Sequence, residues 1–174
     1  MGTRIRSVVE YQVELVTASI TRPSNTTAYD AGDIIADAGG DVLEFSGVTS
    51  KSGMARSGYI DCVRLMSSAN NTPADMELWL FTQKPTLGAD NTALALADID
   101  IQQHLAGIVE FDSADFKVSN SGSGASGNMV AELRNASLAF VAPGGKLWGV
   151  IVPREAYTPA SGETFTVHLV IYQD

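Results

Sequence analysis

Apolar and polar residues alternate along much of the chain, and a period of two is typical of a β-strand with one buried face. In residues 9–19 (VEYQVELVTAS), apolar residues from Val9 to Leu15 share one face, and the polar residues between them share the other. The same pattern predicts strands at residues 58–66, 76–81, 106–111, 138–142, 146–152 and 163–172, with shorter ones at 33–37, 41–45 and 115–119.

The connections between these strands are rich in residues that favour turns, such as SNSGSGASGN at 119–128. One short helix of one or two turns is predicted within Asn91–Gly107, most simply at DIDIQQHL (98–105), with Asn91 or Asp98 as its cap and Gly107 at its end. Many short strands and almost no helix predict an all-β fold, namely a β-sandwich that is jelly-roll-like and has at most one short helix.

The length of 174 residues favours one domain. We expect residues 15–174 to form a single β-sandwich domain, and residues 1–14 to form an N-terminal arm and the start of the first strand.

The chain carries 20 acids against 11 bases, a formal net charge of −9. Phosphate contacts need Lys and Arg, so this balance argues against direct nucleic-acid binding. It also argues against binding to an anionic membrane surface. No segment has the length of a signal-peptide core or a membrane span. The charge fits a soluble protein that docks on another protein, where charge steers the encounter.

The residues that could carry catalysis or bind a metal are few and scattered. His104 and His168 have no histidine or cysteine neighbour at ligand spacing, so no metal site is predicted. Asp98 and Asp100 lie where turns and caps favour aspartate, and they lack the spacing of a calcium loop. No nucleophile elbow, phosphate loop or dinucleotide motif is present. We therefore predict a protein that is not an enzyme, with no catalytic residues and no cofactor.

The remaining notable side chains are expected to be structural. Cys62, within YIDCVRLM, is predicted to be a small core residue, and Trp79 and Trp148 lie in apolar strands that suit the core. Tyr29 and Tyr157 follow alanine in two turn-rich segments, and we predict that both are structural corner anchors. The alternative is that these two tyrosines form a platform for a sugar.

Three long segments resemble small virion proteins of tailed bacteriophages, some of which are capsid decoration or cement proteins. They are ITRPSNTTAYDAGDII (20–35), LWLFTQKPTLGADNTALAL (78–96) and LWGVIVPREAYTPASGETFTVHLVIYQD (147–174), and the similarity extends from about Leu15 to Asp174. The resemblance implies a β-rich, jelly-roll-like protein that forms oligomers, often a homotrimer, on the capsid exterior. Its implied partners are the major capsid protein and further copies of itself, and it supplies no catalytic residues.

The leading hypothesis is a non-enzymatic virion protein, made in the host cytoplasm, that binds the outer capsid surface and stabilises the shell. Two alternatives remain: a tail, baseplate or head-fibre component, and a carbohydrate-binding adhesion module. The segment MGTRIRS is a further candidate interface with a neighbouring subunit or the capsid, through Arg4, Ile5 and Arg6, because arginine pairs well with carboxylates.

Overall fold

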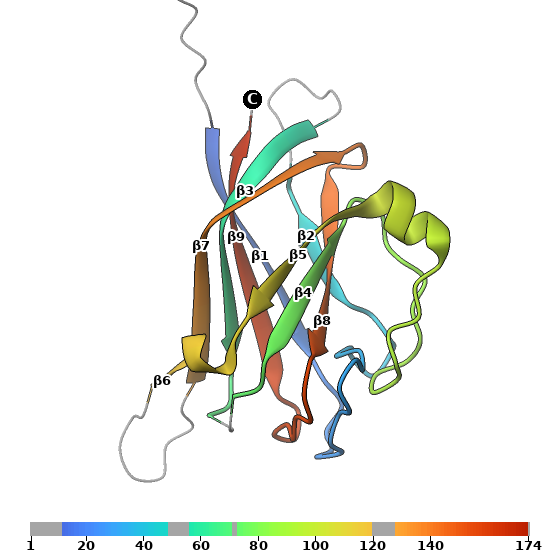
Figure 1. Cartoon of the computed structure of the whole chain (residues 1–174), viewed down its shortest axis with the longest axis vertical. Helices are drawn as coiled ribbons and strands as arrows, with labels where there is room; N and C mark the ends of the chain where they lie inside the picture. The colour runs from blue at the N-terminus through green and yellow to red at the C-terminus, as the bar shows by residue number, and fades with distance from the viewer. Residues whose placement is uncertain (1–11, 49–55, 71–72, 120–127, 174) are drawn as a thin grey trace, which may run out of the picture.

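The computed structural model describes residues 12–48, 56–70, 73–119 and 128–173, and they form two antiparallel sheets packed face to face (Figure 1). The five-stranded sheet has the order β1 (Gln12–Thr21), β9 (Thr164–Gln173), β3 (Arg56–Ser67), β7 (Asn128–Ala142) and β6 (Lys117–Ser119). The four-stranded sheet has the order β2 (Leu43–Ser46), β8 (Lys146–Pro153), β4 (Met76–Phe81) and β5 (Leu105–Phe111). The prediction of a β-sandwich is confirmed.

The strand pairing is nested, and this makes the sandwich a jelly roll. β1 pairs with β9, β2 with β8, β3 with β7, and β4 with β5, all antiparallel. Such pairing results when one long hairpin rolls up into two sheets. The short strand β6 adds to the edge of the larger sheet by pairing with β7.

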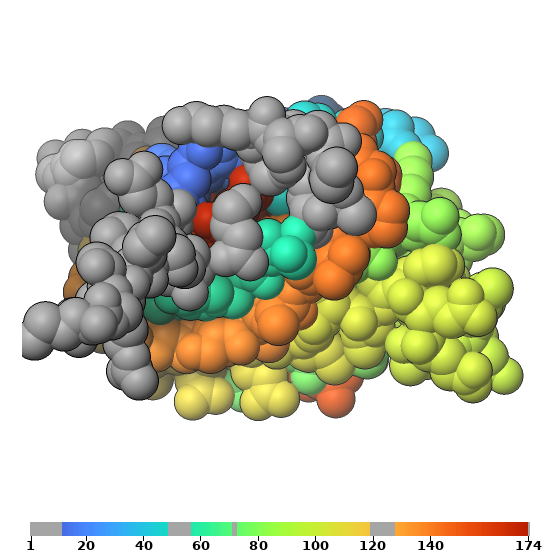
Figure 2. Space-filling view, turned by 90° about the horizontal axis from the view of Figure 1, so that it is seen from above, coloured from blue at the N-terminus to red at the C-terminus, as the bar shows by residue number. Residues whose placement is uncertain are grey.

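The core lies between the sheets and follows the alternation of the strands. In β9, the side chains of Phe165, Val167, Leu169 and Ile171 are completely buried, and each intervening residue is half-buried on the other face. β4 is buried along almost its whole length, because the segment that precedes β5 packs hydrophobic side chains against the smaller sheet. Seen from above, this yellow-green segment projects from one side of the molecule (Figure 2).

Two predicted strands differ from the observed ones. Residues 33–37 form only isolated bridges, Asp33 with Ala93 and Ile35 with Ile151. The strand predicted at 138–142 is the end of the much longer β7. Asn135 and Ser137 have positive φ values of 57° and 50°, which interrupt the extended conformation and hide the strand's continuity in the sequence pattern.

The short helix predicted at Asp98–Leu105 is confirmed, because residues 98–104 are helical. η1 (Asp100–His104) is a single π-helical turn without a side-chain cap, and η2 (Ser113–Asp115) is a 3₁₀ turn. Gly107 does not end the helix, because it lies within β5, where a Cβ atom would be 2.8 Å from a methyl carbon of Leu138. No helix among the described residues is long and apolar enough to cross a membrane.

Cys62 is not a core residue. Against β9, Ile60 pairs with Ile171 and Cys62 with Val170, which marks a β-bulge with Asp61 as the extra residue. The extra residue keeps Ile60 and Val63 in the core and leaves Cys62 half-buried. The simple alternation of the sequence could not anticipate this change of face.

Candidate functional site

Tyr29 and Tyr157 lie side by side in the interior, at the end of the sandwich where β1 ends and β9 begins. The Tyr29 amide donates to the Tyr157 carbonyl at 2.9 Å, and the Tyr157 amide donates back at 3.2 Å. Their rings stack with centroids 6.5 Å apart, and both residues are almost completely buried. No sugar can reach either ring in the folded protein, so these two tyrosines do not form the platform considered above.

A buried arginine holds the first half of this corner together. Arg22 Nε donates to Tyr29 Oη at 2.8 Å, while Nη1 donates to the carbonyls of Asn25 at 2.6 Å and Ala160 at 3.2 Å. Tyr29 Oη in turn donates to Asp90 Oδ1 at 2.7 Å, and Asp90 Oδ2 lies 3.9 Å from Arg22 Nη2. The arginine charge is therefore balanced by a nearby carboxylate and satisfied by fixed acceptors.

A buried glutamate completes the second half. Glu163 Oε1 accepts hydrogen bonds from Tyr157 Oη at 2.6 Å and from Ser67 Oγ, and Oε2 accepts from the Ala160 amide at 2.9 Å. Only 1% of Glu163 is exposed. We call Arg22, Tyr29, Asp90, Tyr157 and Glu163 the polar corner. Its hydrogen bonds tie loops together, and it offers no reacting group to a substrate.

The segments 20–35, 78–96 and 147–174 meet at the polar corner. Arg22 and Tyr29 belong to the first segment, Asp90 to the second, and Tyr157 and Glu163 to the third. Arg22, Asp90 and Glu163 were not predicted from the sequence, because the corner that they share joins segments distant along the chain. Anchoring of the corner by Tyr29 and Tyr157 stays a prediction about stability.

Burial raises the pKa of Tyr29 well above its ordinary value, and this predicts a specific sensitivity to alkali. A tyrosine whose pKa is higher in the folded protein contributes stability that is complete below about pH 10 and falls as the pH rises further. Urea unfolding at pH 9 and pH 11 should therefore show a smaller loss of stability for Tyr29→Phe than for the wild type. Tyr59→Phe, at a partly exposed tyrosine, should lose as much stability as the wild type.

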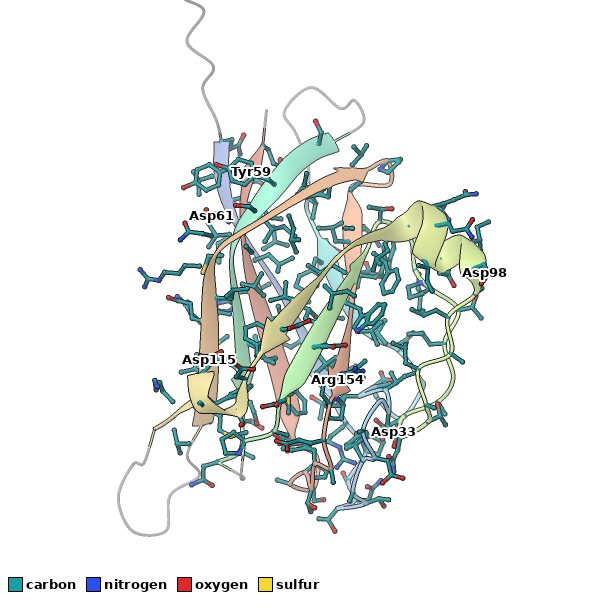
Figure 3. The ribbon with its side chains drawn as sticks, viewed as in Figure 1. Asp33, Tyr59, Asp61, Asp98, Asp115 and Arg154 are labelled. Carbon is teal, nitrogen blue, oxygen red and sulfur yellow. The ribbon has the colours of Figure 1, made fainter. Side chains whose placement is uncertain are left out.

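The outer face of the five-stranded sheet is the most distinctive surface among the described residues. Val13, Tyr172, Tyr59 and Ala139 lie opposite one another in a row across β1, β9, β3 and β7. The rings of Tyr59 and Tyr172 stack with centroids 5.0 Å apart and planes within 3°. Figure 3 shows Tyr59 near the upper end of the sheet, with Asp61 close to it. This end of the sheet presents aromatic and aliphatic groups to solvent.

β1 faces the other way round from the sequence prediction. The alternation predicts Val13 and Leu15 on the apolar, core-facing side, but they are 56% and 62% exposed. Val16, Ala18 and Ile20 fill the core instead. The apolar pattern changes face between Leu15 and Val16, so the strand offers hydrophobic side chains to both sides.

A charged row crosses the middle of the same face. Glu132 accepts from Arg64 Nε at 3.0 Å and from Arg134 Nε at 2.6 Å, and these two hydrogen bonds lower the pKa of its carboxyl group. His168 lies opposite Arg64 in register. Its burial and the arginine charge lower the pKa of the imidazole. This row is polar and is fixed by ion pairs.

Two further sequence predictions concern the N-terminal interface and metal binding. Arg4, Ile5 and Arg6 lie outside the described residues. Among the residues that are described, no three His, Cys, Asp or Glu side chains come together in a way that could hold a metal ion.

No protein-family model and no curated protein matches the chain. One similar solved structure is that of Triatoma virus, with 14% sequence identity and a TM-score of 0.26. The match covers 91% of this chain and 63% of the viral chain, so this chain spans less than two thirds of that protein.

Proposed function

We propose that this protein is a non-enzymatic structural component of a tailed-bacteriophage virion that binds the outer surface of the capsid and stabilises the shell. In this proposal it acts from the capsid exterior as a homotrimer, with the major capsid protein as its partner. It has no direct role in binding nucleic acid or membranes.

The observation that carries the proposal is the meeting of the three phage-like segments at the polar corner. Residues far apart along the chain contribute to one buried network, as in the hydrogen bond from Tyr29 to Asp90, which lie 61 positions apart. Segments that together build one three-dimensional feature support the resemblance to phage virion proteins more strongly than isolated short matches do. The jelly-roll topology agrees with the fold that the resemblance implies.

The fold suits a binding role because its surface is rigid. Two packed sheets with a continuous core hold the exposed side chains of the outer face in fixed positions. Preformed surfaces lose little conformational entropy on binding. Many copies on one shell would make attachment multivalent, so that modest contacts at each copy add up to firm binding of the whole layer.

A binding experiment tests the proposal. Shells assembled from the major capsid protein of the same virus, both before and after expansion, are mixed with the purified protein and sedimented through a density gradient. We expect the protein to travel with the expanded shells and to raise the temperature at which they disrupt. Equal amounts of bovine serum albumin provide the control for trapping.

Other outcomes would replace the proposal. Retention on purified tails without binding to shells would favour a tail, baseplate or head-fibre component. Binding to defined glycans and to neither particle would favour an adhesion module. Hydrolysis or modification of a virion component by the purified protein would show that it is an enzyme.

A further inference from the structure

We propose that the upper outer face of the five-stranded sheet is the surface through which copies of this chain associate with one another. It consists of Val13, Leu15, Tyr59, Val141 and Tyr172, and we call it the tyrosine face. The inference concerns the homo-oligomer within the proposed function and makes no assumption about the capsid.

The tyrosine face combines a ridge with a groove. Val13 and Leu15 project from the edge strand β1. Across the sheet, Gly58, Tyr59, Ala139, Val141 and Tyr172 line a shallow groove of about 460 Å³. Val141 at the rim is 55% exposed. Contiguous apolar surface of this kind marks protein–protein contacts, and tyrosine is enriched where binding energy concentrates.

Close packing keeps the groove in place. A Cβ atom on Gly58 would lie 2.4 Å from the Tyr172 carbonyl oxygen and 3.2 Å from the Phe140 ring. Only glycine allows β3 and β9 to approach so closely at this point. The floor of the groove is therefore a backbone surface held by packing, and it exists before any partner arrives.

Charge favours a second copy as the occupant. The chain carries a net charge of −9, so two copies repel each other across most of their surfaces. Among the described side chains of the outer face, the acids are Asp61 and Glu132, and the bases are Arg64, Lys117 and Arg134. This face is close to neutral, so copies can meet there without the repulsion that the remainder of the molecule imposes.

The shape also suits a like partner. The ridge of β1 adjoins the groove on one face, because Val13 lies opposite Tyr172 and the groove extends over β9, β3 and β7. An aliphatic ridge from one copy can therefore enter the aromatic groove of the next, while its own groove receives another ridge. Such a contact uses two different patches, and a closed ring results when the rotation between copies closes.

Sedimentation equilibrium of the full chain, in the absence of capsids, tests this inference. Leu15→Lys places a charge on the ridge, and Val141→Lys places one at the rim of the groove. Ile99→Lys is the matched control, because Ile99 is 53% exposed beside η1, outside the five-stranded sheet. We expect the wild type and the control to form the same oligomer, and each of the other variants to raise the dissociation constant by about tenfold or more.

A second measurement guards against misfolded variants. Cys62 is the sole cysteine of the chain and is half-buried on the outer sheet face, opposite Val170. Labelling of Cys62 by a maleimide should become slower as the concentration of the wild type rises. In Leu15→Lys, labelling should stay fast at every concentration. The melting temperatures of all variants should remain close to that of the wild type.

The inference is overturned if the wild type is monomeric at every concentration, if Leu15→Lys and Val141→Lys associate like the wild type, or if only the Ile99 variant dissociates. These results are separate from the test of capsid binding. A monomer that still coats shells would remove the self-association face and leave the capsid role intact. An oligomer that binds no shell would do the reverse.

Discussion

Replacing Arg22 with methionine is expected to lower the free energy of unfolding by about 3–5 kcal/mol, because breaking a buried ion pair leaves one charge without compensation. Methionine fills much of the space of the arginine stem but donates no hydrogen bond. Asp90 loses its neighbouring cation, and the carbonyls of Asn25 and Ala160 lose donors in a partly buried site. Urea unfolding followed by tryptophan fluorescence measures the change.

Lys84→Met is the matched control for this prediction. Lys84 pairs with Asp41 on the surface, where both side chains are more than half exposed. An exposed ion pair contributes less than about 1 kcal/mol, so this variant should unfold at nearly the wild-type urea concentration. Similar losses in the two variants would contradict the structural importance assigned to the polar corner.

Replacing Glu163 with alanine is expected to cost about 3 kcal/mol, since it removes one acceptor group from three donors at once. The Tyr157 hydroxyl, the Ser67 hydroxyl and the Ala160 amide all donate to this carboxylate. A buried donor that loses its partner costs about 1–3 kcal/mol, although water that enters the new cavity recovers part of this.

The control for the second prediction is the same substitution at Glu155. This exposed residue accepts one hydrogen bond, from the Asp75 amide at 3.1 Å. Its replacement should change stability by less than about 1 kcal/mol. If Glu163→Ala is as stable as Glu155→Ala, the polar corner does not contribute to the stability of the fold, and the prediction is wrong.

The two corner variants also separate stability from binding. Neither Arg22 nor Glu163 reaches the surface, so at temperatures where the variants remain folded they should bind shells and self-associate like the wild type. Val141→Lys should behave in the opposite way, with normal stability and weakened self-association, because Val141 is exposed at the groove.

The sequence by itself determined the class of the fold. Period-two alternation in residues 163–172 matches β9 closely, since each inward side chain must be apolar to join the core and each outward one is free to be polar. Turn-forming residues between the runs, and the scarcity of helical periodicity, left a β-sandwich as the consistent solution. The position of Tyr29 and Tyr157 in turn-rich segments also predicted them as structural corner anchors.

Only the tertiary structure decided which faces and which distant residues meet. Leu15 and Val16 are both apolar, so the choice of the buried face in β1 depended on packing against the second sheet. A single extra residue at Asp61, relative to β9, turned Cys62 outward. The partnership of Tyr29 with Asp90 spans 61 positions, and no local pattern encodes it. Alternation and turn preference act between neighbours along the chain, whereas burial and charge pairing act between neighbours in space.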